Sequence, residues 1–162
     1  MKRLLLGVGN RLSSDDGVGP TVAASLAGAE GWTAIDCGTA LANASGIVSR
    51  ESPDLLVLVD AARMGLAAGA VRRLPTDGTD RMLASTHGLP LPFVIDRMRA
   101  HVGEVILLGI EPASLALGEA LSPEVATAAE WLVERLRRLE HHQISEYHVG
   151  QTPSERAASG DL

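Results

Sequence analysis

Acidic side chains and one histidine stand at regular places in this 162-residue sequence, where apolar segments end or helices begin. Carboxylates and imidazoles are the side chains that bind divalent metals and transfer protons. The candidates for such chemistry are Asp15, Asp16, Asp36, Asp60, His87 and Glu111. Two carboxylates and an imidazole that meet at one place suit a divalent metal with open coordination positions, which can polarise a carbonyl or activate water.

The segment 4–20 shows how the sequence would position these residues. The apolar run 4–8 indicates a buried strand, and glycines at 7 and 9 allow the chain to turn where the strand ends. Asp15 and Asp16 then stand directly before a helix that apolar spacing predicts over 18–26. We expect one of these two aspartates to cap that helix.

The rest of the chain continues the alternation of strands and helices. Further strands are predicted at 32–36, 55–59, 70–74 and 104–110. Further helices are predicted at 41–49, 89–100 and 123–139. Such alternation indicates an α/β fold with three layers, in which a mostly parallel, twisted sheet of about five strands carries helices on both faces.

Parallel strands end at a common edge, and ligands of open α/β sheets bind there. Asp16, Asp36, Asp60, Glu111 and His87 could therefore converge although they are far apart in the sequence. We expect one domain over residues 1–142. Residues 143–162 are polar and lack periodicity, so we expect them to form a disordered tail.

Composition excludes several classes of function. The chain is 46% hydrophobic with a formal net charge of −6, which argues against a nucleic-acid or anionic-membrane surface. No apolar stretch reaches the roughly 18 residues that suggest a membrane span. The single cysteine, Cys37, excludes an internal disulfide and a cysteine-cluster metal site. We expect a cytoplasmic protein that acts on proteins or small molecules.

Other kinds of site fit less well. Gly7 and Gly9 after a strand, with Asp36 at the end of the next, resemble a dinucleotide site, but Leu12 stands where its third glycine is needed. The neighbouring aspartates would also repel a pyrophosphate. A G-x-S-x-G nucleophile motif is absent, and Cys37 lies beside an acid, which disfavours its thiolate.

Each candidate also has a purely structural interpretation, and the residues alone leave it open. Asp15 and Asp16 could be helix caps, and Asp36 could bond only to loop amides. Glu111, which precedes a proline, could simply end a strand, and His87 could be an ordinary loop histidine.

Together, these residues resemble the hydrogenase maturation endopeptidases, which remove a C-terminal extension from the large subunit of nickel–iron hydrogenases. The resemblance covers residues 4 to about 136. Its motifs, in the family's order, are Gly7-Val8-Gly9-Asn10, Asp15-Asp16-Gly17-Val18-Gly19-Pro20, Asp36-Cys37-Gly38-Thr39, Leu58-Val59-Asp60-Ala61, Thr86-His87 and Gly109-Ile110-Glu111-Pro112. The segments 86–91, 103–106 and 108–110 are most similar to the branch that serves formate-hydrogenlyase-type (hydrogenase 3) enzymes.

The resemblance implies site residues and a metal. It assigns metal binding and catalysis to Asp16, Asp60 and His87. It assigns substrate positioning to Asp36, Gly38 and Thr39. The implied metal is nickel supplied by the precursor, with other divalent metals as alternative occupants. Two positions depart from the family pattern, because Asp16 stands where glutamate is common and Cys37 replaces a glycine.

The expected function is therefore a cytoplasmic, metal-dependent endopeptidase that acts on a nickel-loaded hydrogenase large-subunit precursor. The family is often catalogued with aspartic proteases, although two carboxylates that share a proton are a different mechanism. The alternatives are a chaperone that binds the precursor without cleaving it and, with less in its favour, a nucleotide-binding α/β protein.

Overall fold

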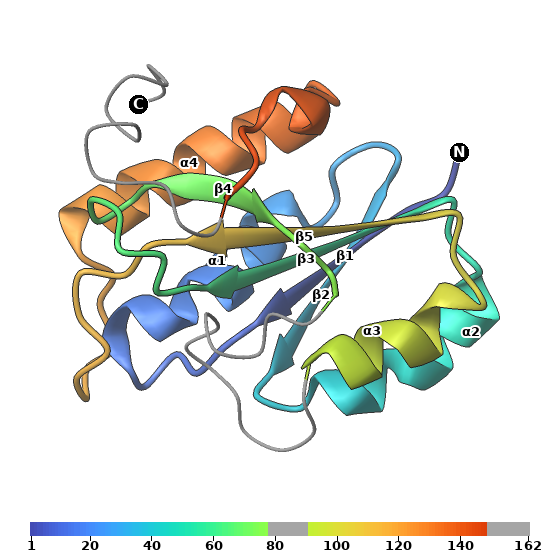
Figure 1. Ribbon diagram of the computed structural model, residues 1–162, viewed down its shortest axis with the longest axis horizontal. Helices are drawn as coiled ribbons and strands as arrows, with labels where there is room; N and C mark the ends of the chain where they lie inside the picture. Colours follow the sequence, from blue (N-terminus) through green and yellow to red (C-terminus); the bar gives the residue numbers. More distant parts are fainter. Residues whose placement is uncertain (78–90, 149–162) are drawn as a thin grey trace.

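The computed structural model describes residues 1–77 and 91–148. In these residues the strands form a five-stranded sheet in the order β2-β1-β3-β5-β4 (Figure 1). Four strands are parallel: β1 (Arg3–Val8), β2 (Trp32–Gly38), β3 (Leu55–Ala61) and β5 (Glu104–Ile110). The short edge strand β4 (Val71–Leu74) pairs with β5 in the antiparallel direction. The predicted mostly parallel sheet is confirmed.

Helices cover both faces of this sheet, as expected (Figure 1). On one face lie α1 (Val18–Leu26) and α4 (Pro123–Arg137), and on the other lie α2 (Ser45–Glu51) and α3 (Leu91–Arg99). Short 3-10 helices precede α1 and α2 and follow α4: η1 (Ser14–Gly17), η2 (Leu41–Ala44) and η3 (His141–Gln143). The helix predicted at 41–49 thus begins with a 3-10 turn.

Strand β3 lies at the centre of the sheet and is buried along its whole length. Its residues alternate between two cores, because successive side chains of a strand point to opposite faces. Val57 and Val59 pack with α1 and α4, whereas Leu56 and Leu58 pack with α2 and α3. Burying each such side chain contributes about 2 kcal/mol to folding. The strand therefore holds its last polar residue, Asp60, in a fixed place.

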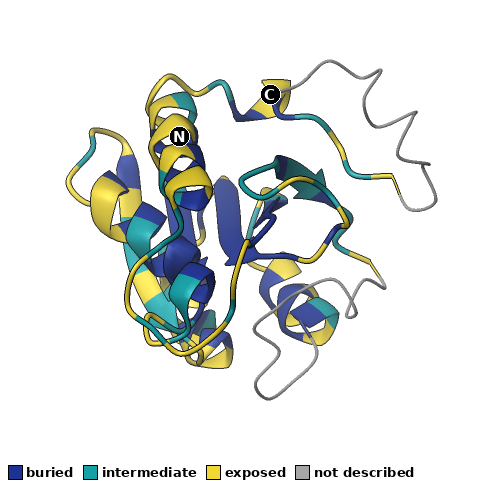
Figure 2. Ribbon diagram, turned by 90° about the vertical axis from the view of Figure 1, so that its left-hand side faces the viewer, coloured by how far each residue is buried: buried dark blue, intermediate teal, exposed yellow. Residues whose placement is uncertain are grey.

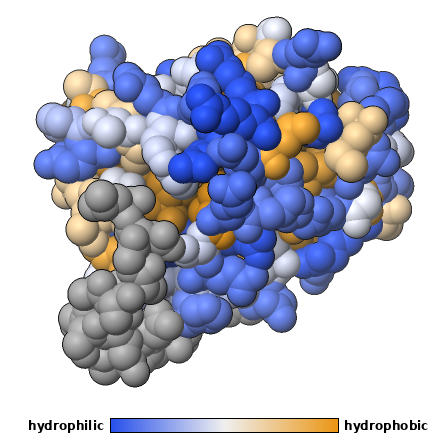
Figure 3. All heavy atoms as spheres, turned by 90° about the horizontal axis from the view of Figure 1, so that it is seen from above, coloured by the Kyte–Doolittle hydropathy of each residue, from blue (hydrophilic) through white to orange (hydrophobic). Residues whose placement is uncertain are grey.

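The outer face of α4 is exposed. Seen from above, this side of the molecule is mostly hydrophilic, with small hydrophobic areas between the polar side chains (Figure 3). Within the described ranges, every helix falls short of the length and apolar character that crossing a bilayer requires.

The expected start of the tail is wrong. Ile144 is 3% exposed in the core between α4 and the sheet. The following residues add to the edge of β4, because the N–H of Arg73 donates to the carbonyl of Ser145 and the N–H of Tyr147 donates to the carbonyl of Arg73, at 2.9 and 2.8 Å. An edge strand offers such unpaired backbone groups. Tyr147 is also partly buried against the core formed with α2 and α3. Residues 149–162 lie outside the described part.

Candidate active site

The carboxyl ends of the four parallel strands form one edge of the sheet, which faces the viewer in Figure 2. The strands there are buried at the centre of the molecule, and many exposed residues lie in the surrounding loops and helices. The loops that follow β1, β2, β3 and β5 all leave the sheet at this edge. Every described residue of the predicted site is in one of these loops or at the end of the strand before it.

Asp16 lies in η1, directly before α1, and is only 3% exposed. The backbone N–H of Asn10 donates to its Oδ2 atom at 2.8 Å, which fixes the orientation of the carboxylate. The turn is tight because Gly9 lies against the backbone of Asp16. Gly9 has a φ of 142°, and a Cβ atom at this position would overlap the carbonyl oxygen of Asp16. Glycine is therefore required where the chain leaves β1.

Asp60 occupies the penultimate position of β3 and is 2% exposed. Its neighbour in β5 is Gly109, where a Cβ atom would overlap the side chains of Leu74 and Ala62. Gly19 brings the first turn of α1 directly over the ends of β1 and β3, because a Cβ atom on it would overlap the carbonyl oxygens of Val8 and Val59. The segment that carries Asp16 thus contacts the strand that carries Asp60.

Two buried carboxylates at one sheet edge have a clear electrostatic consequence. Removing an ionised carboxylate from water costs several kcal/mol unless hydrogen-bond donors or cations compensate. Oxygen donors of this kind suit a divalent cation. The placement of Asp16 and Asp60 is compatible with a metal site shared with a further ligand.

The predicted third ligand, His87, lies outside the described residues, as does Thr86. Among residues 1–77 and 91–148 there is no group of three or more histidine, cysteine, aspartate or glutamate residues that could hold a metal ion by itself. The described residues thus bring Asp16 and Asp60 to one edge, and the complete ligand set remains a prediction.

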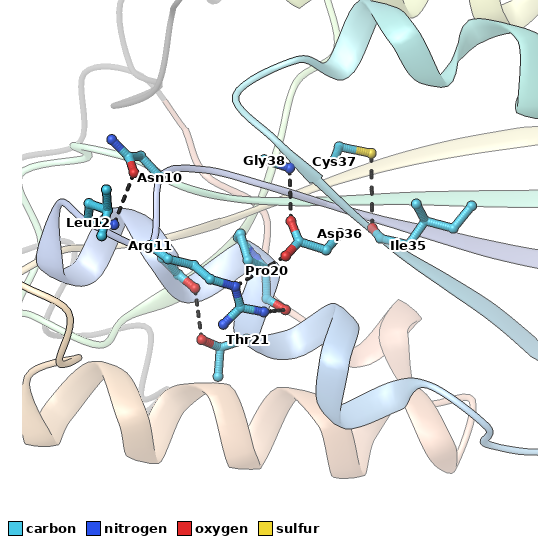
Figure 4. Close-up of polar contacts among 10 residues, drawn as sticks. Asn10, Arg11, Leu12, Pro20, Thr21, Ile35, Asp36, Cys37 and Gly38 are labelled. Atoms are coloured by element: carbon cyan, nitrogen blue, oxygen red, sulfur yellow. Dashed lines mark hydrogen bonds and ion pairs between the residues drawn. The ribbon is translucent and has the colours of Figure 1, made fainter.

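Asp36 lies at the same edge, near the end of β2, and its side chain is exposed. It accepts hydrogen bonds from the Nε of Arg11 at 3.1 Å and from the N–H of Gly38 at 2.8 Å. Arg11 also donates to the carbonyl of Pro20 at 3.0 Å and so joins the end of β2 to α1 (Figure 4). Thr39 is exposed beside them. Sequence reasoning missed Arg11, because only the folded chain brings it to Asp36.

Cys37 is partly buried against the core formed with α2 and α3. Its burial and the neighbouring Asp36 carboxylate raise the pKa of the thiol to about 11. The thiol therefore stays protonated near neutral pH, which argues against a cysteine nucleophile at this position. The interpretation of Cys37 as a small core residue agrees with this environment.

Neither aspartate before α1 caps this helix. The N-cap is Gly17, and no described side chain caps the N–H groups at the start of the helix; the Thr21 hydroxyl instead donates to the carbonyl of Gly17 at 2.8 Å. Asp15 is fully buried and instead accepts hydrogen bonds from the N–H groups of Ala113, Ser114 and Ser122 at 2.7 to 3.0 Å. Burial raises the pKa of Asp15, but these bonds and the Ser122 hydroxyl lower it by more, so the pKa lies below its ordinary value. Asp15 thus holds the loop after β5.

Glu111 also has a structural role. Its Oε2 atom accepts hydrogen bonds from the N–H groups of Met64 and Leu66 at 2.6 and 3.3 Å. Its own N–H donates to the carbonyl of Ala70 at 2.9 Å. Glu111 therefore fixes the loop that follows Asp60, a structural role that goes beyond ending a strand.

Comparison with known proteins identifies the family of this chain. The family model described as "Hydrogenase maturation protease" matches residues 19–138. The chain belongs to this family. The protease is 36% identical to the hydrogenase 3 maturation protease of Escherichia coli K12 over 139 residues, which cover 84% of this chain and 89% of the relative. The predicted resemblance, including its hydrogenase 3 branch, is confirmed.

Solved structures have the same fold as the protease. The solution structure of the endopeptidase HycI from Escherichia coli matches it with a TM-score of 0.84 and 33% identity, covering 94% of this chain and 100% of that one. The crystal structure of a [NiFe] hydrogenase maturation protease, HycI, from Thermococcus kodakarensis matches with a TM-score of 0.76 and 30% identity. This match covers 85% of this chain and 91% of that one. The protein is thus an enzyme, a protease of hydrogenase maturation.

Proposed function

We propose that this protease removes the C-terminal extension from a nickel-loaded hydrogenase large-subunit precursor, and that Asp16, Asp60 and His87 bind the metal at the cleavage site. The observation that carries the proposal is the burial of Asp16 and Asp60 at one edge of the sheet, at 3% and 2% exposure. In this proposal the nickel belongs to the substrate.

The donor set suits such a metal. Asp16 and Asp60 would each contribute a carboxylate oxygen and His87 an imidazole nitrogen, which leaves coordination positions open for groups of the precursor. Bound there, the metal would polarise the scissile carbonyl or position water for attack. Because three protein ligands do not complete the coordination, a nickel ion already held by the precursor could be shared across the interface.

The chain's own residues would orient this site. The hydrogen bond from Asn10 holds the Asp16 carboxylate, and the close packing of Gly19 on the ends of β1 and β3 holds Asp16 near Asp60. Aspartate is shorter than the glutamate common in the family by about one methylene. The tight turn at Gly9 would compensate by keeping the Asp16 backbone close to the sheet.

The loop after β2 would position the substrate. Asp36 and Thr39 are exposed at the same edge, and Arg11 together with the N–H of Gly38 holds the Asp36 carboxylate. A polypeptide that lies across the ends of β1 and β3 would meet this loop. We also propose that the reaction takes place in the cytoplasm, because a single cysteine fits a reducing compartment. A net charge of −6 supports a protein substrate rather than a nucleic acid.

Purified protease should be incubated with nickel-loaded and with nickel-free precursor, and the mass of the large subunit should be followed. We expect only the loaded precursor to be shortened. Equal cleavage of the nickel-free precursor would overturn the metal mechanism and favour two carboxylates that share a proton. A loaded precursor that stays bound but intact would instead indicate a chaperone.

A further inference from the structure

Two leucines are exposed next to the candidate active site. Leu12 is 55% exposed in the loop after β1, and Leu117 is 91% exposed in the loop after β5. Strands β1 and β5 are the two neighbours of β3, whose end carries Asp60. The two leucines therefore belong to the loops that flank the position of Asp60 in the sheet.

These two loops are bonded to each other. The N–H of Gly118 donates to the carbonyl of Leu12 at 2.9 Å, and the N–H of Ser14 donates to the carbonyl of Gly118 at 2.7 Å. The hydroxyl of Ser14 donates to the carbonyl of Ala116, also at 2.7 Å. In Figure 1 the loops lie side by side at the left of the molecule. The backbones of Leu12 and Leu117 are thus adjacent and fixed relative to each other.

Asp15 anchors the second loop at both ends, because it binds the N–H groups of Ala113 and Ser114 on one side of Leu117 and that of Ser122 on the other. The anchor lies beneath the surface, so the exposed leucine contributes little to holding the loop. The need to hold this loop in place therefore does not explain why residue 117 is apolar.

The loop that carries Leu117 is poor in charge. The segment 113–120 reads Ala-Ser-Leu-Ala-Leu-Gly-Glu-Ala and contains one charged residue, Glu119. Single exposed leucines are common on protein surfaces and need no explanation. Here, however, two exposed leucines lie on loops that are bonded to each other, beside a site that acts on a protein. The substrate must approach this surface, and the leucines offer it apolar contact.

We propose that Leu12 and Leu117 form a docking surface, here called the leucine rim, for an apolar stretch of the hydrogenase large-subunit precursor close to its scissile bond. This inference rests on the proposed function. The occupant is the precursor, because a polypeptide whose scissile bond lies beside Asp60 of the protease must pass next to the loops after β1 and β5. The scarcity of charge in 113–120 selects an apolar stretch.

The test compares Leu12→Ser/Leu117→Ser with the unmodified protease on nickel-loaded precursor. The double variant should raise KM about tenfold, which corresponds to about 1.4 kcal/mol of lost binding free energy. The kcat should change less than about twofold, because the rim touches no reacting atom. The separate double variant Leu12→Met/Leu117→Met should keep the original KM, since methionine retains the apolar contact.

Leu139→Ser is the matched control, because Leu139 is 42% exposed and follows α4. That end of α4 lies at the opposite edge of the sheet, where Trp32 at the start of β2 donates to the carbonyl of Leu136. This variant should keep the original KM.

An unchanged KM in the double serine variant, while the unmodified protease still cleaves, would overturn the leucine rim and leave the proposed function standing. A shift from dimer to monomer in the same variant would show that a second copy occupies the rim, which also overturns the inference. Failure of the unmodified protease to cleave would overturn the proposed function itself.

Discussion

The hydroxyl of Ser122 lies 3.0 and 2.9 Å from the two carboxylate oxygens of Asp15, although 107 positions separate these residues in the sequence. The carboxylate also accepts three backbone N–H groups of the loop after β5. Donors of this number stabilise the ionised form, which agrees with a pKa below the ordinary value. This contact joins the loop after β1 to the loop after β5.

Asp15→Asn should lower the free energy of unfolding by about 3 kcal/mol, because the amide nitrogen faces backbone donors and a buried donor is left unsatisfied. Urea unfolding measures this loss. Glu119→Gln is the control in the same loop, since Glu119 is exposed and should change stability by less than about 0.5 kcal/mol.

The pH dependence of the same variant gives a second test. A carboxylate whose folded pKa is depressed stabilises the protein above its ordinary pKa of 3.8, and this contribution is lost as the pH falls through the folded pKa. The difference in the free energy of unfolding between the unmodified protein and Asp15→Asn should therefore become smaller below pH 3.8. A difference that stays constant down to the acid limit would contradict this assignment.

The contrast between Asp15 and α1 shows what the sequence could and could not predict. Local spacing predicted α1 at 18–26 and β5 at 104–110 with the observed bounds, because periodicity is a property of neighbouring residues. The partners of Asp15 lie about 100 positions away, so a local pattern suggested a helix cap instead. The same holds for Arg11, whose partner Asp36 is 25 positions away.

For the candidate site, the sequence predicted where its carboxylates lie, because they follow strands. The alternation of strands and helices placed Asp16 and Asp60 at one edge of the sheet, and the structure has them there, both buried. Periodicity could not separate Asp16 from Asp15 or Glu111, because all are carboxylates after apolar runs. Their different hydrogen-bond partners appear only in the folded chain.

Substitutions of the proposed ligands test the mechanism directly. Asp60→Asn and His87→Ala should each abolish cleavage of nickel-loaded precursor while the melting temperature shows a folded protein. Asp16→Glu should keep measurable cleavage, since it retains the carboxylate, whereas Asp16→Ala should not. Product mass is the readout. Full cleavage by His87→Ala would remove that residue from the ligand set.

Truncation tests residues 143–148, which include the last residue of η3. Ending the chain after His142 should destabilise the protein by about 3 kcal/mol or more, because it removes the buried Ile144 and the hydrogen bond from the Tyr147 hydroxyl to the carbonyl of Met64. Ending it after His148 should leave the melting temperature unchanged. Equal melting temperatures for the two truncated chains would show that residues 143–148 contribute nothing.

We expect His141 to make the stability of the protein depend on pH. Burial and the neighbouring His142, Arg3 and Arg73 lower its pKa, while Glu104 raises it by less. Its Nδ1 atom has no hydrogen-bond partner among residues 1–77 and 91–148. Because the unfolded state binds the proton more readily, stability should fall as the pH drops below 6.5.

In His141→Leu the loss of stability between pH 7 and pH 5.5 should be smaller, as measured by urea unfolding at each pH. The control is His101→Gln, because His101 is exposed after α3. If the free energy of unfolding changes with pH equally in the unmodified protein, His141→Leu and His101→Gln, then His141 is not the group that titrates.

The Cys37 thiol should react slowly. With a pKa raised to about 11 from 9.0, its thiolate is about a hundredfold scarcer at pH 8 than that of an unperturbed thiol. Alkylation by iodoacetamide, followed by mass, should be slower by at least this factor than in the urea-unfolded chain. Asp36→Asn should increase the rate, because the carboxylate contributes to the raised pKa. Rapid modification of the folded protein would contradict this environment.

Gly7 and Gly19 allow β1 and α1 to touch backbone to backbone, since a Cβ atom on Gly7 would overlap the carbonyl oxygen of Gly19, and one on Gly19 would overlap that of Val8. In a saturation mutagenesis screen scored by hydrogenase activity in cells, both positions would tolerate as few replacements as Asp60, for a reason unrelated to chemistry. Such a map would overstate the size of the active site. Measuring protein abundance for every variant in the same library would separate the two glycines from the residues that act on the substrate.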